Sequence, residues 1–321
     1  LTAQHRLIDP ATTALGITVG SIARYGEPET IPQRPIPISA GQKGFPSVFT
    51  RTGEGVSNAV KPEFVDYGGN IGVTQPVAGE IRWNINRALN EPTLNKTLDK
   101  VFKGWQGTSF AAPHVTHVAA KLERALHSQI GEDPSANLIR ALLASSAKYC
   151  RRDWLELAKP PDYNPRAQGL TQEWRLRLSG YGKVDDSTLF TDRNHVTLFT
   201  EDALELRQIH LYKIPVPSEF LDLRSNKRIA IGFAYNPPTR LSRKADIANS
   251  LWFEVFRRID VEALLNYKGK KETANEQAAE SIIEDSSLKH GAPFSPGYTE
   301  VRESTLQQRV WEKGARGGSD L

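Results

Sequence analysis

A serine that precedes a long helical pattern is the residue of this chain best suited to covalent chemistry. Gly107, Thr108 and Ser109 lead into an Ala-rich, apolar stretch that predicts a helix over residues 109–128. At the amino end of a helix the first N–H groups lack intrahelical partners and the helix dipole is positive. Negative charge that develops beside Ser109 during acyl transfer would be stabilised there. We therefore interpret Ser109 as a nucleophile, with Gly107 allowing a close backbone approach because it lacks a Cβ.

Two simpler interpretations concern the same helix. A serine at this position can act as a helix N-cap, which satisfies the first N–H groups without any chemistry. His114 follows Ser109 by five residues, whereas neighbours on one helix face are three or four residues apart. We therefore expect His114 to point away from Ser109 and not to act as its base.

Other segments predict the elements that position the serine. Residues 16–23 are β-branched and bounded by glycines, which predicts a short buried strand. Residues 134–147 predict a second helix, with Pro134 in its first turn. Residues 24–45 are rich in proline and glycine and predict an irregular loop.

The pattern changes after about residue 190. Short β-branched and aromatic runs separated by turn residues predict strands, namely residues 195–199, 208–215, 228–235 and 251–256. We expect these strands to form a small antiparallel β-sandwich. The sequence thus predicts one domain over residues 1–190 and a β-rich accessory domain over residues 191–321, whose completeness it leaves open.

Composition excludes several classes of protein. The 321 residues include 41 Lys and Arg against 37 Asp and Glu, a net charge of +4. The basic residues are scattered apart from Lys268–Lys271, whereas a nucleic-acid-binding surface needs them clustered. No apolar run approaches the roughly 18 residues of a membrane span. The single cysteine excludes an internal disulfide and fits a reducing compartment. We predict neither nucleic acid nor membrane as a partner.

Residues 107–115, Gly-Thr-Ser-Phe-Ala-Ala-Pro-His-Val, resemble the nucleophile motif G-T-S-x-A-x-P-H-V of the subtilisin-like serine proteases (subtilases, peptidase family S8). Further segments resemble that family in the expected order: residues 16–23, 46–53, 61–71 and 180–185. The resemblance implies an α/β fold, with residues 1–190 as the C-terminal part of a parallel-sheet catalytic domain. It also implies a serine endopeptidase that acts on protein or peptide substrates without a cofactor or metal. Ser109 would be catalytic, with Gly107, Thr108 and Pro113 supporting its loop.

The other catalytic residues of the family have no match before Ser109. Its aspartate lies in D-[ST]-G and its histidine in H-G-T-x-V-A-G, contexts that Asp9, Asp66 and His5 lack. Asn70 lies in a different turn from the family's oxyanion asparagine. Because the chain contains no methionine, we expect a fragment whose Asp, His and Asn lie upstream of Leu1. Residues 1–321 alone are then expected to be inactive, since a serine needs a base.

Two functions stay open at this stage. The first is the serine endopeptidase, and the second is a non-catalytic subtilase-derived binding or regulatory module that works through the C-terminal β region. Bacterial subtilases that share the phrases Ile214–Pro217 and Ala234–Pro238 imply a cytoplasmic location and a AAA-type ATPase partner, although secretion is not excluded.

Overall fold

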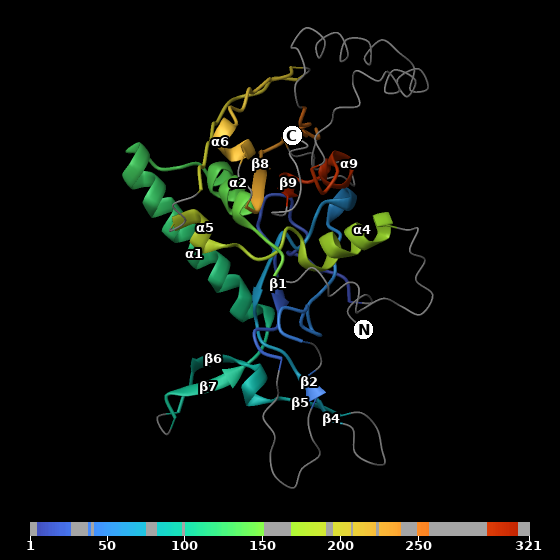
Figure 1. Ribbon diagram of the computed structural model, residues 1–321. Helices are drawn as coiled ribbons and strands as arrows, with labels where there is room; N and C mark the ends of the chain where they lie inside the picture. Colours follow the sequence, from blue (N-terminus) through green and yellow to red (C-terminus); the bar gives the residue numbers. More distant parts are fainter. Residues whose placement is uncertain are drawn as a thin grey trace.

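Figure 1 shows an elongated molecule in which α1 (Thr108–Ile130) runs along one side of a small central sheet. The computed structural model describes residues 5–26, 38–39, 42–74, 82–97, 100–150, 168–190, 195–206, 208–222, 225–238, 249–256 and 294–313. The shorter helices in this part are η2 (Val56–Asn58), η3 (Arg87–Leu89), α4 (Gln168–Ser179), α5 (Asp186–Phe190), α6 (Ser218–Asp222) and α9 (Tyr298–Val301).

The central sheet is a parallel pair. Strands β1 (Val19–Ile22) and β3 (Phe64–Tyr67) align from Val19 opposite Phe64 to Ile22 opposite Tyr67. Both strands are almost completely buried, as expected for a parallel pair covered by helices. The predicted strand within residues 16–23 is confirmed, and the α/β arrangement agrees with the expected fold class.

Helix α1 packs on both strands of this pair. α1 buries Ala111, Val115, Val118, Leu122 and Leu126, a spacing of three and four residues that places all five on one face. The predicted helix over residues 109–128 is therefore confirmed. In the part of the chain that the structure describes, no helix has both the length and the apolar character that a membrane crossing requires.

The second helix, α2 (Ala136–Ser146), begins after Ser135, whose Oγ accepts a hydrogen bond from the Leu138 N–H at 3.0 Å. This serine is the N-cap, because its hydroxyl satisfies one of the unpaired first-turn donors. Pro134 precedes the cap and does not lie in the first turn, which corrects our expectation.

Two small sheets lie beyond the amino end of α1 (Figure 1). In one, β4 (Gly72–Thr74) pairs antiparallel with β2 (Ile38–Ser39) and with β5 (Arg82–Asn84). The other is an antiparallel hairpin of β6 (Glu91–Leu94) and β7 (Phe102–Trp105). Because β7 ends just before Gly107, this hairpin runs directly into the turn that carries Ser109.

The C-terminal region contributes a second antiparallel pair. β8 (Lys227–Ala234) and β9 (Leu306–Lys313) align from Lys227 opposite Lys313 to Ala234 opposite Leu306. One face of the pair packs on α2, and Leu306 joins the main core. On the other face Trp311 packs with Phe294 in a second apolar cluster.

The β-sandwich is not seen in the described residues. The run at 228–235 is confirmed as β8, but residues 195–199, 208–215 and 251–256 form no strand. An apolar, β-branched pattern favours a strand only where a neighbouring strand accepts its hydrogen bonds. Residues 195–217 instead form an exposed arm, with its two halves joined through side chains such as His210 and Asp202, 3.2 Å apart.

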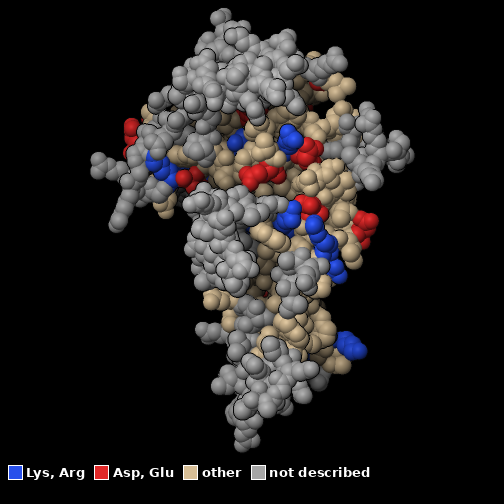
Figure 2. All heavy atoms as spheres, turned by 90° about the vertical axis from the view of Figure 1, so that its right-hand side faces the viewer, with Lys and Arg blue, Asp and Glu red and all other residues tan. Residues whose placement is uncertain are grey.

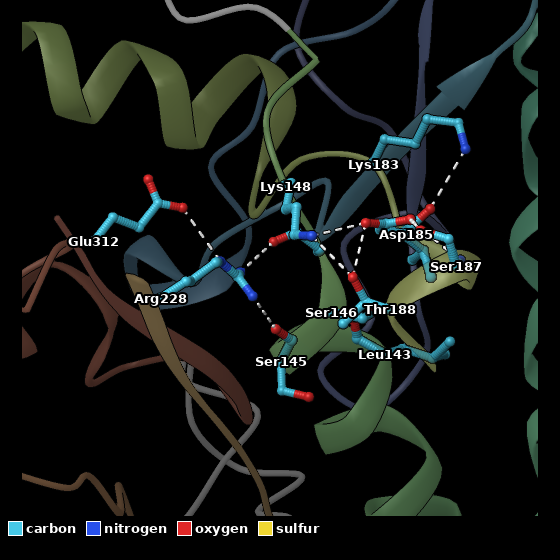
Figure 3. Close-up of polar contacts among 12 residues, drawn as sticks. Leu143, Ser145, Ser146, Lys148, Lys183, Asp185, Ser187, Thr188, Arg228 and Glu312 are labelled. Atoms are coloured by element: carbon cyan, nitrogen blue, oxygen red, sulfur yellow. Dashed lines mark hydrogen bonds and ion pairs between the residues drawn. The ribbon is translucent and has the colours of Figure 1, made fainter. Parts of the chain in front are cut away.

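Side chains from β8 and β9 close the carboxyl end of α2, and Figure 3 shows Arg228 of β8 at this end. Arg228 donates to the carbonyls of Ser145 and Ala147 at 2.9 and 2.8 Å, and the Gln308 amide donates to the Ala147 carbonyl at 2.9 Å. Nearby, the Lys148 ammonium donates to Asp185 at 2.8 Å. The contacts of Arg228 and Gln308 cross residue 190, while the division into domains at that position stays a prediction.

A buried ion pair lies at the amino ends of β1 and β3. The Lys61 ammonium donates to Glu63 and to the Gly16 carbonyl, and the other Glu63 oxygen accepts the Thr18 N–H at 2.8 Å. Burial lowers the pKa of Lys61 and raises the pKa of Glu63, each against the attraction of the other charge. The pair fastens the start of both strands to the preceding loop.

Candidate active site

Ser109 is the second residue of α1, and Gly107 is the N-cap. The Phe110 N–H donates to the Gly107 carbonyl at 3.0 Å, which closes the first turn. Ser109 is exposed to solvent. Its backbone N–H belongs to the first-turn donors that a helix leaves without intrahelical partners. The structure therefore presents a hydroxyl and an amide donor together at the positive end of a helix.

The glycine before the helix is required for its backbone conformation. Gly107 has a φ of +152°, a backbone conformation that residues other than glycine rarely adopt. A Cβ at this position would nevertheless meet no atom closer than 3.8 Å. Our expectation of a close approach at Gly107 is therefore wrong. The close approach lies at Gly68, where a Cβ would fall 2.6 Å from the Gly107 carbonyl oxygen.

A chain of hydrogen bonds fixes the nucleophile turn to the central sheet. The hydroxyls of Ser21 in β1 and Ser47 lie 2.8 Å apart, and Ser47 also donates to the Gly69 carbonyl at 2.6 Å. The Gly107 N–H donates to the carbonyl of Gly68 at 2.8 Å. Since both serines are fully buried, the carboxyl ends of β1 and β3 hold the turn in one position.

Amide side chains fill the space behind the turn. With its nitrogen turned inward, Asn90 donates to Gln106 Oε1 at 3.2 Å and to the carbonyls of Asn86 and Asn70. Asn70 is fully buried, and its Oδ1 accepts the Val48 N–H at 3.4 Å. That Asn70 is not the oxyanion donor stays a prediction.

The end of β3 carries an aromatic ring between two cations. The Arg24 guanidinium lies 4.2 Å from the Tyr67 ring centre, and Lys183 lies 5.3 Å from it. Arg24 also pairs at 2.8 Å with Glu91, the buried first residue of β6. This pair ties the base of the β6–β7 hairpin to the body of the protein, and cation–π contact adds to it.

The remaining residues of the motif shape the helix. Pro113 follows Ser109 by four residues and has no N–H, so the Ser109 carbonyl lacks its normal helical donor. Thr108 and His114 are exposed. Within the residues that the structure places, no side chain hydrogen-bonds to the Ser109 hydroxyl. His114 in particular makes no such contact, as expected from its spacing.

Comparison with known proteins agrees with this geometry. The sequence profile of the Subtilase family matches residues 2–182. The chain belongs to the subtilase family. It is also 30% identical over 318 residues to an uncharacterized protein, y4bN, of Sinorhizobium fredii (strain NBRC 101917 / NGR234), an alignment that covers 97% of this chain and 68% of that protein. No solved structure gives a significant match.

In this subtilase the two candidate acids before Ser109 are engaged elsewhere. The backbone carbonyl of His5 accepts the Thr52 N–H at 2.8 Å. Asp66 forms an ion pair with Lys183 at 3.5 Å and accepts the Tyr67 N–H. Asp9 accepts a hydrogen bond from Thr12.

In the described part of the chain, no candidate base lies in hydrogen-bond contact with the Ser109 hydroxyl. This part also contains no group of three or more His, Cys, Asp or Glu residues placed to hold a metal ion. Among the described residues on the face shown in Figure 2, charged side chains of both signs are interspersed.

Proposed function

We propose that this subtilase is a serine endopeptidase and that Ser109 is its nucleophile. The observation that carries the proposal is the placement of an exposed Ser109 at the second position of α1, fixed by the Gly68–Gly107 hydrogen bond. Peptide bonds in protein or peptide substrates are the class that the family implies. Gly107, Thr108 and Pro113 give the turn its shape.

The reaction needs groups that the described residues do not supply around Ser109. A histidine would take the hydroxyl proton as Ser109 Oγ attacks the carbonyl carbon, and an aspartate would orient that histidine. The oxyanion would be bound by the Ser109 N–H and an asparagine amide, each such donor being worth about 2.7–4 kcal/mol in the transition state. We propose that a histidine, an aspartate and an asparagine outside the described residues complete the site, and that the described residues alone do not turn over substrate.

The test is covalent labelling of the full-length protein with a fluorophosphonate, combined with hydrolysis of a quenched fluorescent peptide. Wild-type protein and Ser128→Ala are expected to label and to cleave, because Ser128 is an exposed serine of the same helix. Ser109→Ala is expected to do neither. Labelling that persists in Ser109→Ala, or folded wild type that neither labels nor cleaves, would overturn the proposal.

A second candidate is a non-catalytic binding or regulatory module. It is favoured by the arm at residues 195–217, which exposes large apolar side chains such as Val196, Leu206 and Ile209 at 79%, 75% and 56%. Exposed apolar surface of this kind commonly marks a protein contact. A clean negative in the labelling experiment would leave this candidate. A AAA-type partner and a cytoplasmic location stay predictions that rest on the family resemblance.

A further inference from the structure

The segment that leads to Ser109 exposes an unusual number of large apolar side chains. Within residues 83–105 these are Trp83, Ile85, Leu94, Val101, Phe102 and Trp105, with exposed fractions between 46% and 71%. Large exposed apolar surface on a soluble protein commonly marks a contact with another molecule. The position of this surface, next to the candidate nucleophile, points to a contact with the substrate.

The strand register of the β6–β7 hairpin places part of this surface on one face. Leu94 lies directly opposite Phe102, so their side chains share a face. Leu94 is 71% exposed and Phe102 is 59% exposed. We call these two residues the hairpin face. Lys103 and Trp105 lie on the opposite face, where the lysine ammonium is 5.1 Å from the indole ring centre.

The hairpin face has a fixed position relative to Ser109. The Arg24 Nε–H donates to both carboxylate oxygens of Glu91, at 2.8 and 3.1 Å, and this contact holds the base of β6. The Asn70 N–H donates to the Leu89 carbonyl at 2.8 Å just before that base. The other strand, β7, leads into α1. Between them the Gly107 N–H donates to the Gly68 carbonyl, which holds this end of the hairpin. In Figure 1 the hairpin projects beside the amino end of α1.

The charge around the hairpin face is mainly positive. The hairpin carries Lys96, Lys100 and Lys103, and its acidic residues are Glu91 and Asp99. Glu91 is buried and paired with Arg24, so it offers no charge to a partner. A partner segment that combines apolar with acidic side chains would therefore complement this surface.

We propose that the hairpin face is a substrate-docking surface, which binds an apolar, acidic segment of the polypeptide being cleaved at a distance from the scissile bond. The inference rests on the proposed function and specifies its substrate class. From Phe102 to Gly107 is five residues, or about 17 Å at the rise of an extended strand. A substrate must therefore extend about five or six residues beyond the scissile bond to reach Phe102.

The experiment uses quenched peptides with one cleavage sequence and extensions of increasing length on either side, assayed with the full-length protein. Extensions of six or more residues that contain Leu, Phe and Glu are compared with Gly/Ser extensions of equal length. The apolar, acidic extensions are expected to raise kcat/KM about tenfold, mainly through KM, since burial of one large apolar side chain is worth at least that. Extensions of three residues are expected to have no effect.

The double variant Leu94→Ser/Phe102→Ser is expected to abolish the gain from long extensions. Both positions are exposed, so the substitutions leave the core intact. The matched control is Val196→Ser/Leu198→Ser, which changes two equally exposed residues on the arm and is expected to keep the gain. A wild type insensitive to the extension, or a gain that survives in the double variant, would overturn the proposal.

Two further measurements separate this inference from the proposed function. Binding of the long peptide to full-length Ser109→Ala, measured by fluorescence anisotropy, reports on docking without any turnover and is expected to weaken about tenfold in the double variant. Fluorophosphonate labelling reports on Ser109 without the hairpin. If the double variant instead converted a dimer to a monomer in sedimentation and bound the peptide normally, the surface would join two copies of the chain and the proposal would be wrong.

Discussion

The carboxyl end of α2 is covered by side chains of the protein, whereas the amino end of α1 is exposed to solvent. At the end of α2, the carbonyls of Ser145 and Ala147 are covered by Arg228 and Gln308 from two strands distant in sequence. At the start of α1, Ser109 stands in solvent and no side chain among the placed residues covers its hydroxyl. One helix end is satisfied within the protein and the other is left available.

This difference separates stability from function. A buried polar group without a hydrogen-bond partner destabilises the fold by its full desolvation penalty. The hydrogen bonds at the end of α2 therefore contribute to the free energy of unfolding. The turn before α1 is held rigidly from behind, through Ser21, Ser47 and Gly68, while its front stays open. Substitutions on the satisfied side should change stability, and substitutions at Ser109 should change chemistry alone.

The largest effect is expected at the buried ion pair. Glu63→Gln removes the charge that compensates Lys61 in an almost fully buried site, and breaking a buried pair costs about 3–5 kcal/mol. Urea unfolding of the full-length protein measures the change. Asp186→Asn is the control, because its pair with Lys121 is 3.8 Å long and exposed, and it should cost no more than about 0.5 kcal/mol. Equal losses in both variants would contradict the comparison.

The next effect concerns the cover of α2. Gln308→Ala removes a donor to the Ala147 carbonyl and leaves it buried with fewer partners, at a cost of about 1–3 kcal/mol. Gln208→Ala, an exposed glutamine of the arm, should be neutral. A Gln308→Ala protein with an unchanged urea midpoint would show that the β8–β9 pair does not support α2.

A smaller and pH-dependent effect is expected at Asp185. Burial alone would raise the pKa of this carboxyl, but hydrogen bonds from Lys148, Ser187 and Thr188 outweigh it and hold the pKa well below its usual range. Because the folded pKa lies below the unfolded value of about 3.9, Asp185 stabilises the fold above that pH and loses this contribution as the pH falls through the folded pKa.

Asp185→Asn should therefore lower the free energy of unfolding by about 1 kcal/mol at pH 7. The difference between wild type and variant should shrink below about pH 4, where the unfolded carboxyl takes up its proton. Chemical denaturation at a series of pH values tests this. A difference that grew toward acid pH would reverse the sign and refute the assignment.

The smallest change in stability is expected at the open end. Ser109→Ala alters an exposed side chain without a hydrogen-bond partner among the placed residues, so its urea midpoint should match wild type within about 0.5 kcal/mol. The same variant should lose all fluorophosphonate labelling. A clear loss of stability would mean that Ser109 serves the helix as a structural residue.

The sequence predicted the helices and strands whose apolar residues recur at a regular spacing and whose ends carry clear residue signals. The stripe from Val115 to Leu126 and the glycines that bound residues 16–23 are signals of this kind, and α1 and β1 lie where expected. The serine at the start of α1 was likewise visible, because its turn has a distinctive local sequence. What the sequence could not supply was the residue that activates Ser109.

The elements that were missed have long-range causes. β9 contains Gln307, Gln308 and Arg309, all buried, so it lacks the alternation of a half-buried strand and is stabilised by carbonyls far away in sequence. The hairpin of β6 and β7 depends on the Arg24–Glu91 pair, which no local pattern reveals. Conversely, residues 208–215 have the composition of a strand but find no partner in the described part of the chain.

The contact between Gln308 and the end of α2 also has a consequence for synthesis. The amide and the Ala144 carbonyl that it binds are separated by 164 positions in the chain. At about 5–20 residues per second, a ribosome completes β9 on the order of ten seconds after α2 has formed. During that interval the last turn of α2 relies on water, and its apolar face is uncovered. The end of α2 is therefore completed only after β9 has been synthesised.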